Sequence, residues 1–435
     1  MDSPLLYCTQ KRGISKMLKI LANEIIDEYY SYKKQKTDSL GNIAIPTGTD
    51  RINYKKFEFD ISLFSTRIEE KFNNRKYNFS DLYRRVIPKK YGGFRNTYIF
   101  TISDYIVLKL LLKSLLLHYE TVLGENNYIL GYRKGFSTAD VMMNIRRGFF
   151  DGYEYVLHID IVDFLNEIDR NILLKQVQNY FINVDSNEFF YLNRYFAFLD
   201  KISPFKDKGI PTGCVLNPLL SNIYLHILDL YVEKNLLSTE IRYIRYGDDL
   251  FFLLLNKIEH LKIFDDVSKF LSQELKLKIH NFDKADKTSL FDLSRDNYFV
   301  FSAYKFNKSM IQIDNHPIQW IKKNILHIVK YNFEDLNCKI NFINAYILGY
   351  NKVSYKHCID NYNYDTPLCK HSIMFFFMYS TDLQQMIQFD KWIKRTIINY
   401  YFHIHNKKLL KHDTNQLISI KKMYFRLKKQ NYWEG

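Results

Sequence analysis

Two adjacent aspartates, Asp248 and Asp249, stand between two apolar, strand-forming runs in the segment IRYIRYGDDLFFLL (241–254). Adjacent carboxylates repel each other, and removing even one of them from water is costly unless a positive charge compensates. Gly247 permits a tight backbone at the tip of the hairpin that the two runs predict, so both carboxylates can lie near one point. A divalent metal ion is the usual compensation. The segment therefore predicts a metal-binding hairpin tip, and the alternative is a solvated turn.

A third carboxylate, Asp160, ends a strand-forming run in YEYVLHIDIVDF (153–164). If this strand lies beside the hairpin, Asp160 faces the pair Asp248 and Asp249 across it. Three converging carboxylates suit two Mg²⁺ ions, which prefer oxygen ligands, with Mn²⁺ as a substitute. Two such ions can activate an attacking hydroxyl and stabilise a leaving pyrophosphate, and the Ile161 carbonyl could add one more oxygen ligand. The alternative is that Asp160 is a surface residue.

Between the two acidic sites, the segment GIPTGCVLNPLLSN (209–222) places a glycine-containing loop directly before a helix. Gly209 and Gly213 let the backbone approach a flat ligand closely. Asn217 is the expected N-cap of the helix, with Pro218 at its first position. The alternative is a turn that only introduces the helix.

In this order and spacing, the motifs IDIVDF, GIPTGCVLNPLLSN and RYGDDLFF resemble the palm motifs of reverse transcriptases. The flanking segments resemble further motifs of the same family. Two segments resemble the fingers motifs: IPKKYGGFRNTYIFTISDYIVLKLLL (87–112) and ILGYRKGFSTADV (129–141). LKIHNFDKADKT (277–288) resembles the lysine-bearing motif, and YFVFSAYKF (298–306) resembles the primer grip. The resemblance to the thumb is looser and lies in NAYILGYNK and FFFMYSTDLQQMIQFDKWIKRTI.

This resemblance implies an α+β fold, the right-hand polymerase, with fingers, a palm built on a mixed or antiparallel sheet, and a helical thumb. Along the chain we expect an N-terminal helical extension and the start of the fingers over 1–87, the fingers and palm over 88–310, and the thumb and C-terminal region over 311–435. The activity implied is that of an RNA-directed DNA polymerase, which joins dNTPs on an RNA template into a DNA product.

The resemblance also implies roles for single residues. Asp160 and Asp248 would be metal ligands, and Asp249 the third catalytic carboxylate. Arg95 and Arg133 fall where the fingers hold the incoming triphosphate, because a guanidinium can fork onto phosphate oxygens; the alternative for each is a surface charge. The whole set expected around the nucleotide is Arg95, Arg133, Phe164, Leu165, Gly209, Pro211, Thr212 and Gly213.

Two lysines of the lysine-bearing motif, Lys284 and Lys287, are candidates for the general acid that protonates the leaving pyrophosphate. Because the local spacing is irregular, both remain open.

Position 165 departs from the family pattern. Relatives usually carry there an aromatic residue that clashes with a ribose 2′-OH, whereas this chain has Leu165, preceded by Phe164. Leucine is bulky but not planar, so discrimination against ribonucleotides is in question. Smaller departures are Thr212 for a common Gln, Asn217 for a common Ser, and Ala303 for the usual Gly.

Hydrophobic periodicity predicts the elements that must position these residues. Helix and strand patterns alternate from 88 to about 306, and the strands thin out after about 310. The expected elements are a helix over 14–35, a polar linker over 37–51, a helix that begins near Ser103, a helix over 258–278, and a basic, aromatic helical appendage over 371–402.

The chain of 435 residues carries a net charge of +15, so an anionic partner is expected, most simply nucleic acid. A genome of low GC content, which would encode many Lys, Asn, Ile, Tyr and Phe residues, is the alternative explanation. The longest apolar stretch, 106–119, is interrupted by Lys109 and Lys113 and predicts a core helix rather than a membrane span. With no signal peptide visible, a cytoplasmic protein without a membrane partner is expected.

Five cysteines form no C-x-x-C pair, and their odd number argues against a disulfide framework. The one candidate zinc cluster is His357, Cys358, Cys369 and His371, whose spacings fit zinc poorly. We expect packing roles for these residues instead.

Within the family, a stand-alone chain with a basic, helical C-terminal part resembles the bacterial defence-associated and abortive-infection enzymes. We expect it to copy a dedicated non-coding RNA in antiviral defence, without an RNase H domain. The alternatives are a retron reverse transcriptase, a template-free or protein-primed DNA polymerase and, in another class, a catalytically silent RNA-binding scaffold. Homo-oligomers and protein partners stay open. The basic residues over 421–429 would either grip structured RNA or form a solvated face.

Overall fold

In the computed structural model the chain forms two compact units. The first consists of Met1–Tyr30 and Ala44–Asp292, and the second of Ser31–Ile43 and Leu293–Gly435. Helices and antiparallel sheets make up both units, so the predicted α+β class is confirmed. The three-part division of the chain stays a prediction. The residues that the structure describes are 17–26, 49, 52, 54–88, 94–123, 126–133, 135–180, 186–282, 287–292, 298–330, 336–348, 373–405, 414 and 416–429.

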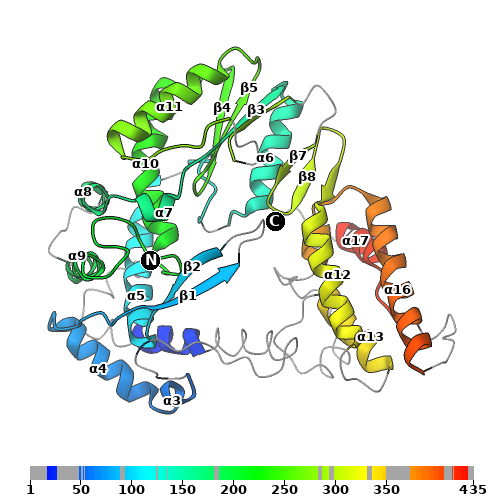
Figure 1. Ribbon diagram of the computed structural model, residues 1–435, viewed down its shortest axis with the longest axis horizontal. Helices are drawn as coiled ribbons and strands as arrows, with labels where there is room; N and C mark the ends of the chain where they lie inside the picture. The colour runs from blue at the N-terminus through cyan, green and yellow to red at the C-terminus, as the bar shows by residue number, and fades with distance from the viewer. Residues whose placement is uncertain are drawn as a thin grey trace. The chain divides into compact units, whose positions relative to one another are not determined.

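A four-stranded sheet forms the centre of the first unit, with the strand order β4-β5-β3-β6 (Figure 1). Every neighbouring pair in it is antiparallel. Strands β4 and β5 are joined by the tight turn at Gly247 and Asp248, which is the predicted hairpin. The strands are β3 (Tyr155–Asp160), β4 (Ile241–Tyr246), β5 (Asp249–Leu254) and β6 (Ser289–Asp292).

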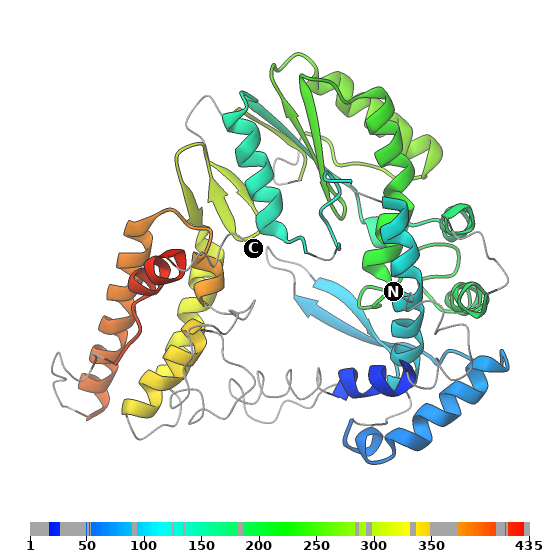
Figure 2. The same ribbon diagram turned by 180° about the vertical axis from the view of Figure 1, so that it is seen from behind.

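Helices cover both faces of this sheet, which explains why β5 is almost continuously apolar. Leu250, Phe252 and Leu254 belong to the main core cluster, together with residues of α10 and α11. On the other face, Gly148 of α6 lies so close to Leu253 that an added Cβ would overlap that side chain. Figures 1 and 2 show α6 on one side of the sheet and α10 with α11 on the other. These helices are α6 (Thr138–Phe150), α10 (Asn217–Asn235) and α11 (His260–Glu274).

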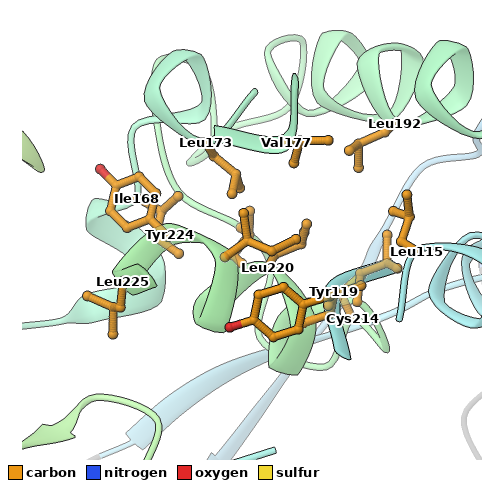
Figure 3. Packing of buried hydrophobic residues seen from close by; sticks show 14 of the residues in the cluster. Leu115, Tyr119, Ile168, Leu173, Val177, Leu192, Cys214, Leu220, Tyr224 and Leu225 are labelled. Atoms are coloured by element: carbon orange, nitrogen blue, oxygen red, sulfur yellow. The ribbon is translucent and has the colours of Figure 1, made fainter. Parts of the chain in front are cut away.

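A layer of helices packs around α10, as Figure 3 shows for the side chains between α5, α8, α9 and α10. Leu220 and Tyr224 of α10 lie at its centre, and both are fully buried. Because α10 is enclosed by the sheet and by other helices, apolar residues occur around most of its circumference. The neighbouring helices are α5 (Ile102–Leu123), α8 (Arg170–Tyr180) and α9 (Asn187–Leu199).

The start of α10 corrects one expectation. Leu216 occupies the N-cap position and makes no side-chain capping bond, so the assignment of Asn217 as N-cap is wrong. The Asn217 side chain instead donates a hydrogen bond to the Pro211 carbonyl at 2.9 Å. This amide therefore ties the helix to the loop that precedes it.

The rest of the first unit includes a two-stranded hairpin and several shorter helices. Residues 17–26 are helical, within the range expected for the first helix, whereas most of the expected linker lies outside the described residues. The other elements are α3 (Tyr54–Phe59), α4 (Ile61–Asn73), β1 (Tyr83–Pro88), β2 (Phe94–Ile99) and α7 (Phe164–Glu167).

The second unit combines a three-stranded antiparallel sheet with five helices among its described residues. The predicted grip hairpin is β7 and β8, and β9 adds a strand beyond it. The expected appendage is two helices, and Asp382 accepts hydrogen bonds from the first backbone amides of the longer one, α16. The elements are β7 (Phe299–Phe301), β8 (Tyr304–Phe306), β9 (Ile311–Ile313), α12 (Asn315–Lys330), α13 (Leu336–Leu348), α15 (Ile373–Phe377), α16 (Leu383–His405) and α17 (Ile420–Lys429).

None of the helices over the described ranges combines the length and the apolar content that a membrane span requires. The candidate zinc residues His357, Cys358, Cys369 and His371 lie outside the described residues.

Candidate active site

The register of the central sheet brings the three predicted carboxylates to one edge. In the antiparallel pair of β3 and β5, Asp160 lies directly opposite Asp249. Asp248 precedes Asp249 on the tight turn, where Gly247 adopts a φ of +65° that favours glycine. Directly opposed residues in an antiparallel pair have Cα atoms roughly 4.5–5.5 Å apart. A strand end and a turn therefore concentrate three negative charges.

The electrostatics of these carboxylates show a shortage of positive charge. Burial, together with repulsion from Asp249 and Asp160, raises the pKa of Asp248 to about 6. Burial also raises the pKa of Asp160, although the ammonium group of Lys287 opposes that effect. Clustered carboxylate oxygens that resist ionisation fit a hard divalent cation by their chemistry, because a cation would restore their charged form.

In the structure, two histidines and one lysine contact these carboxylates. His158 Nε2 lies 2.7 Å from Asp249 Oδ1, and the His158 ring stacks on Phe251 with centroids 4.7 Å apart. His280 Nε2 lies 3.5 Å from Asp160 Oδ2. Within the described ranges, no three Asp, Glu, His or Cys side chains are grouped so as to hold a metal ion directly.

His158 and His280 were missed by the reasoning from sequence. The motif HIDI contains a signal for the first, because residues two apart on a strand point to the same face. His280 has no such signal in the sequence. An isolated bridge between Ile161 and Ile279 places it beside Asp160, and a bridge between distant segments cannot be predicted from local periodicity.

Lys287 is the lysine that the structure places at the site. Its Nζ lies 3.1 Å from Asp160 Oδ2. Burial disfavours its charged form, but the nearby carboxylates, Asp160 first, outweigh burial and raise its pKa. Lys284 lies outside the described residues.

The loop 209–213 packs against neighbouring backbone. Gly209 has a φ of +84°, and an added Cβ there would lie 2.7 Å from the Asn166 carbonyl oxygen. Gly213 has a φ of +106°, and an added Cβ would lie 2.7 Å from the Tyr98 carbonyl oxygen. The close approach that these glycines permit in the structure is thus to this chain's own backbone. It fixes the loop between α7 and β2.

The other residues expected near the nucleotide occupy varied environments. Phe164 is 4% exposed and belongs to the core, with its ring 6.3 Å from that of Tyr224. Leu165 is half-buried against the core cluster, and its carbonyl accepts a hydrogen bond from the Ile210 amide at 2.8 Å. The Thr212 carbonyl accepts from the Tyr98 amide at 2.8 Å. The loop therefore contacts both the element of Leu165 and the hairpin of Arg95.

The two arginines differ in their surroundings. Arg95 is exposed on β2, opposite Ile87 of β1. The Arg133 side chain is only 8% exposed, and its guanidinium contacts Glu120 at 3.2 Å and the carbonyl of Asn126. Arg133 is thus held inside the unit, so it would have to leave Glu120 to meet a phosphate.

Tyr132 connects this region to the carboxylates, and it too was missed. An added Cβ at Gly247 would lie 3.1 Å from Tyr132 Cε2, so the tyrosine ring covers the turn. Loss of water around the phenol, followed by the charge of Asp248, raises the pKa of Tyr132 to about 12, and Arg95 opposes this rise.

The raised pKa of Asp248 predicts a stability effect that depends on pH. Because the folded-state pKa is about 6, the group's contribution to stability is full below the unfolded pKa of about 4 and is lost as the pH rises through 6. Without metal, Asp248→Asn should therefore raise the free energy of unfolding at pH 7 by about 1–2 kcal/mol and have little effect near pH 4.

Urea denaturation in EDTA at the two pH values measures this difference. Asp265→Asn, at an exposed position of α11, is the matched control. Equal effects of Asp248→Asn at both pH values would contradict the electrostatic account.

Part of the sequence is similar to known proteins. Two proteins of Saccharomyces cerevisiae are similar over 173 residues, which is 39% of this chain: the putative COX1/OXI3 intron 1 protein at 20% identity and the putative COX1/OXI3 intron 2 protein at 24%. The match spans only 20% of the length of each.

Among solved structures, apo telomerase from Candida tropicalis is similar with a TM-score of 0.45 and 13% identity, over 82% of this chain and 66% of that one. Telomerase from Candida albicans in complex with a fragment of telomeric RNA is similar with a TM-score of 0.42 and 11% identity, over 87% and 68%.

The family model described as reverse transcriptase (RNA-dependent DNA polymerase) matches residues 87–321, more than half of the chain. The matched range contains Asp160, Asp248 and Asp249. On this evidence of sequence and site together, the chain belongs to the reverse transcriptase family.

Proposed function

We propose that this protein is an RNA-directed DNA polymerase that joins dNTPs by phosphoryl transfer at the edge of the central sheet. The observation that carries the proposal is the register of Asp160 with Asp249, with Asp248 on the adjoining turn, in a chain of the reverse transcriptase family. Phosphoryl transfer depends mainly on positioning and on compensation of charge. A rigid cluster of oxygens at a strand end meets both needs.

Asp160, Asp248 and Asp249, with the Ile161 carbonyl, would hold two Mg²⁺ ions, and Mn²⁺ could substitute. When bound, such ions neutralise charge on the attacking and leaving oxygens. His158 orients the Asp249 carboxylate through its 2.7 Å contact. The chain's own residues thus pre-arrange the acidic cluster.

Of the two lysines proposed as general acid, Lys287 is the one that lies within the described residues. Its ammonium group, 3.1 Å from Asp160, carries a proton at the edge of the carboxylate cluster. A lysine ammonium group is protonated at neutral pH, so it has a proton to donate to the leaving pyrophosphate. Lys284 remains the alternative.

For the incoming nucleotide we propose two groups of residues around this edge. Arg95 offers an exposed guanidinium for phosphate, and Arg133 could join it if Glu120 released it. The loop of Gly209, Pro211, Thr212 and Gly213, packed against the segment of Phe164 and Leu165, would form the wall at the sugar.

Replacing Asp248 and Asp249 together by Asn should lower dNTP incorporation by at least about a thousand-fold, because the cluster then loses two of its three negative charges. Incorporation of labelled dNTPs on an RNA template with a DNA primer measures this, and chelation by EDTA should abolish it in the parent protein. Asp265→Asn is again the control, since it removes one exposed carboxylate from the same unit. Undiminished synthesis by the double variant would refute the proposed site, whereas no incorporation by the parent protein would favour a catalytically silent RNA-binding scaffold.

Leu165 is proposed to govern sugar selection. Phe164 is buried in the core, whereas Leu165, the next residue of α7, is only half-buried. Leu165→Tyr should increase the preference for dNTPs over rNTPs by about ten-fold, because a planar ring sets a harder limit against a 2′-OH. The ratio of kcat/KM for the two nucleotides measures the effect, with Leu165→Met as the volume-matched control. An unchanged ratio in Leu165→Tyr would show that this residue does not select between the two sugars.

We further propose that the protein copies a dedicated non-coding RNA in bacterial antiviral defence, as a cytoplasmic enzyme. The net charge of +15 supports a nucleic-acid partner. The proposal also draws on the resemblance to stand-alone defence-associated members of the family. The retron type, and template-free or protein-primed synthesis, are the alternatives that the product would reveal.

Protein purified from its native operon should retain one abundant RNA and, with Mg²⁺ and dNTPs, yield DNA complementary to it. Sequencing both the bound RNA and the product is the measurement. A homopolymer or simple repeat without a matching RNA would contradict templated copying and favour template-free synthesis. DNA covalently attached to the protein would indicate priming on a side chain.

A further inference from the structure

A fully buried ion pair lies behind the catalytic turn. Arg245 of β4 and Asp229 of α10 both have 0% exposed side chains. The guanidinium meets the carboxylate as a fork, with Nε 2.8 Å from Oδ1 and Nη2 2.6 Å from Oδ2. The Tyr243 hydroxyl donates a further hydrogen bond to Asp229 Oδ1 at 3.0 Å. This pair is therefore fixed in orientation as well as in position.

The remaining nitrogen of the fork points to the turn. Arg245 Nη1 donates to the Gly247 carbonyl at 3.2 Å and to Asn222 Oδ1 at 2.9 Å. Gly247 is the residue that directly precedes Asp248. The guanidinium thus holds from behind the peptide group that leads into the two adjacent aspartates.

Asn222 extends the network to a second segment, the loop 128–131. Its Nδ2 donates to the Gly131 carbonyl at 2.8 Å. The backbone of Arg245 is bonded to the same loop, because its amide donates to the Tyr128 carbonyl at 2.8 Å and its carbonyl accepts from the Leu130 amide at 2.9 Å. Loop and strand therefore share both main-chain and side-chain bonds.

Gly131 completes the contact between the loop and the turn. An added Cβ at Gly131 would overlap the Gly247 amide nitrogen and lie 2.8 Å from the carbonyl carbon of Tyr246. The two backbones thus touch without an intervening side chain. A displacement of either one would be transmitted to the other.

Stability alone does not account for such a pair. Removing two charges from water is costly, and well-packed apolar residues often replace a buried pair without loss of stability. The directional contacts of Arg245 to the Gly247 carbonyl and to Asn222 are what apolar residues could not supply. The pair is therefore better explained by the geometry that it gives to the turn than by a gain in the free energy of folding.

We propose that Arg245, Asp229 and Asn222 are positioning residues that fix the turn of Asp248 and Asp249 against the loop 128–131, and so set the rate of the chemical step. The inference rests on the proposed polymerase function. It assigns these residues no contact with substrate. Their effect is to hold the carboxylates of Asp248 and Asp249 close to that of Asp160.

The test separates positioning from folding by removing the charge pair as a unit. In Arg245→Met with Asp229→Leu, no unpaired charge stays buried, so we expect near-native melting, while the turn loses its anchor. kcat should then fall about 10- to 100-fold, with KM for dNTP changed by less than about three-fold, because small misplacements of reacting groups act on the chemical step. Arg242→Met with Asp151→Leu is the matched control. It removes a partly exposed arginine–aspartate pair whose arginine lies on the same strand, β4, and whose aspartate caps the end of α6.

Arg245→Lys provides a second variant should the double variant fail to fold. Lysine keeps a charge beside Asp229 but lacks the fork, so the Gly247 carbonyl and Asn222 lose their donor and kcat should fall in the same way. Wild-type kcat in either variant, once folded, would overturn the proposal.

Amide hydrogen exchange of residues 246–249 is a readout that does not depend on activity. We expect it to accelerate in the Arg245 variants and to stay unchanged in the Arg242 control. If the parent protein made no DNA, the polymerase proposal would fail, while this exchange would still support or refute the anchoring of the turn.

Discussion

The antiparallel register between β3 and β5 is the constraint on which the site depends. A shift by one residue would turn Asp160 away from Asp249. It would also exchange the apolar side chains of β5 between the two helical layers that enclose them, so that each would meet a layer packed for another side chain. Burial of both faces of the sheet therefore fixes the register, and the register fixes the carboxylates. In this way the core and the chemistry of the protein are specified by the same hydrogen-bonded ladder.

That arrangement places like charges together, and the surrounding residues moderate the repulsion. His158 contacts Asp249, and Lys287 contacts Asp160, yet the pKa of Asp248 remains raised. The raised pKa means that the three carboxylates together destabilise the folded protein at neutral pH. Perturbed carboxylates of this kind are common at functional sites, and the proposed metal ions would compensate their charge.

The sequence was sufficient to predict the three carboxylates, because apolar strands ending in acid and a Gly-Asp-Asp turn are local patterns. The hairpin of β4 and β5 followed from the same patterns, and the α+β class followed from the resemblance to the family. Partners across long sequence separations could not be predicted in this way. His280 is brought to Asp160 by the isolated bridge between Ile161 and Ile279, and Arg133 meets Glu120 of α5 across the loop that follows this helix.

Positions at element boundaries were also beyond the local signals. Asn217 has the chemistry of an N-cap, but tertiary contact with the Pro211 carbonyl attracts its side chain and the helix begins one residue earlier than a cap would require. Arg245 precedes the turn in a run that reads simply as a strand, and only the three-dimensional path of α10 brings Asp229 and Asn222 to it.

The contact of Gly131 with Gly247 limits how such an active site can diversify. Where backbone meets backbone, the separation is set by peptide geometry and no alternative rotamers or substitutions can adjust it. The centre is therefore closed to gradual adaptation. Changes in substrate preference would have to arise at its rim, where side chains such as Arg95 and Leu165 can be exchanged without moving the carboxylates.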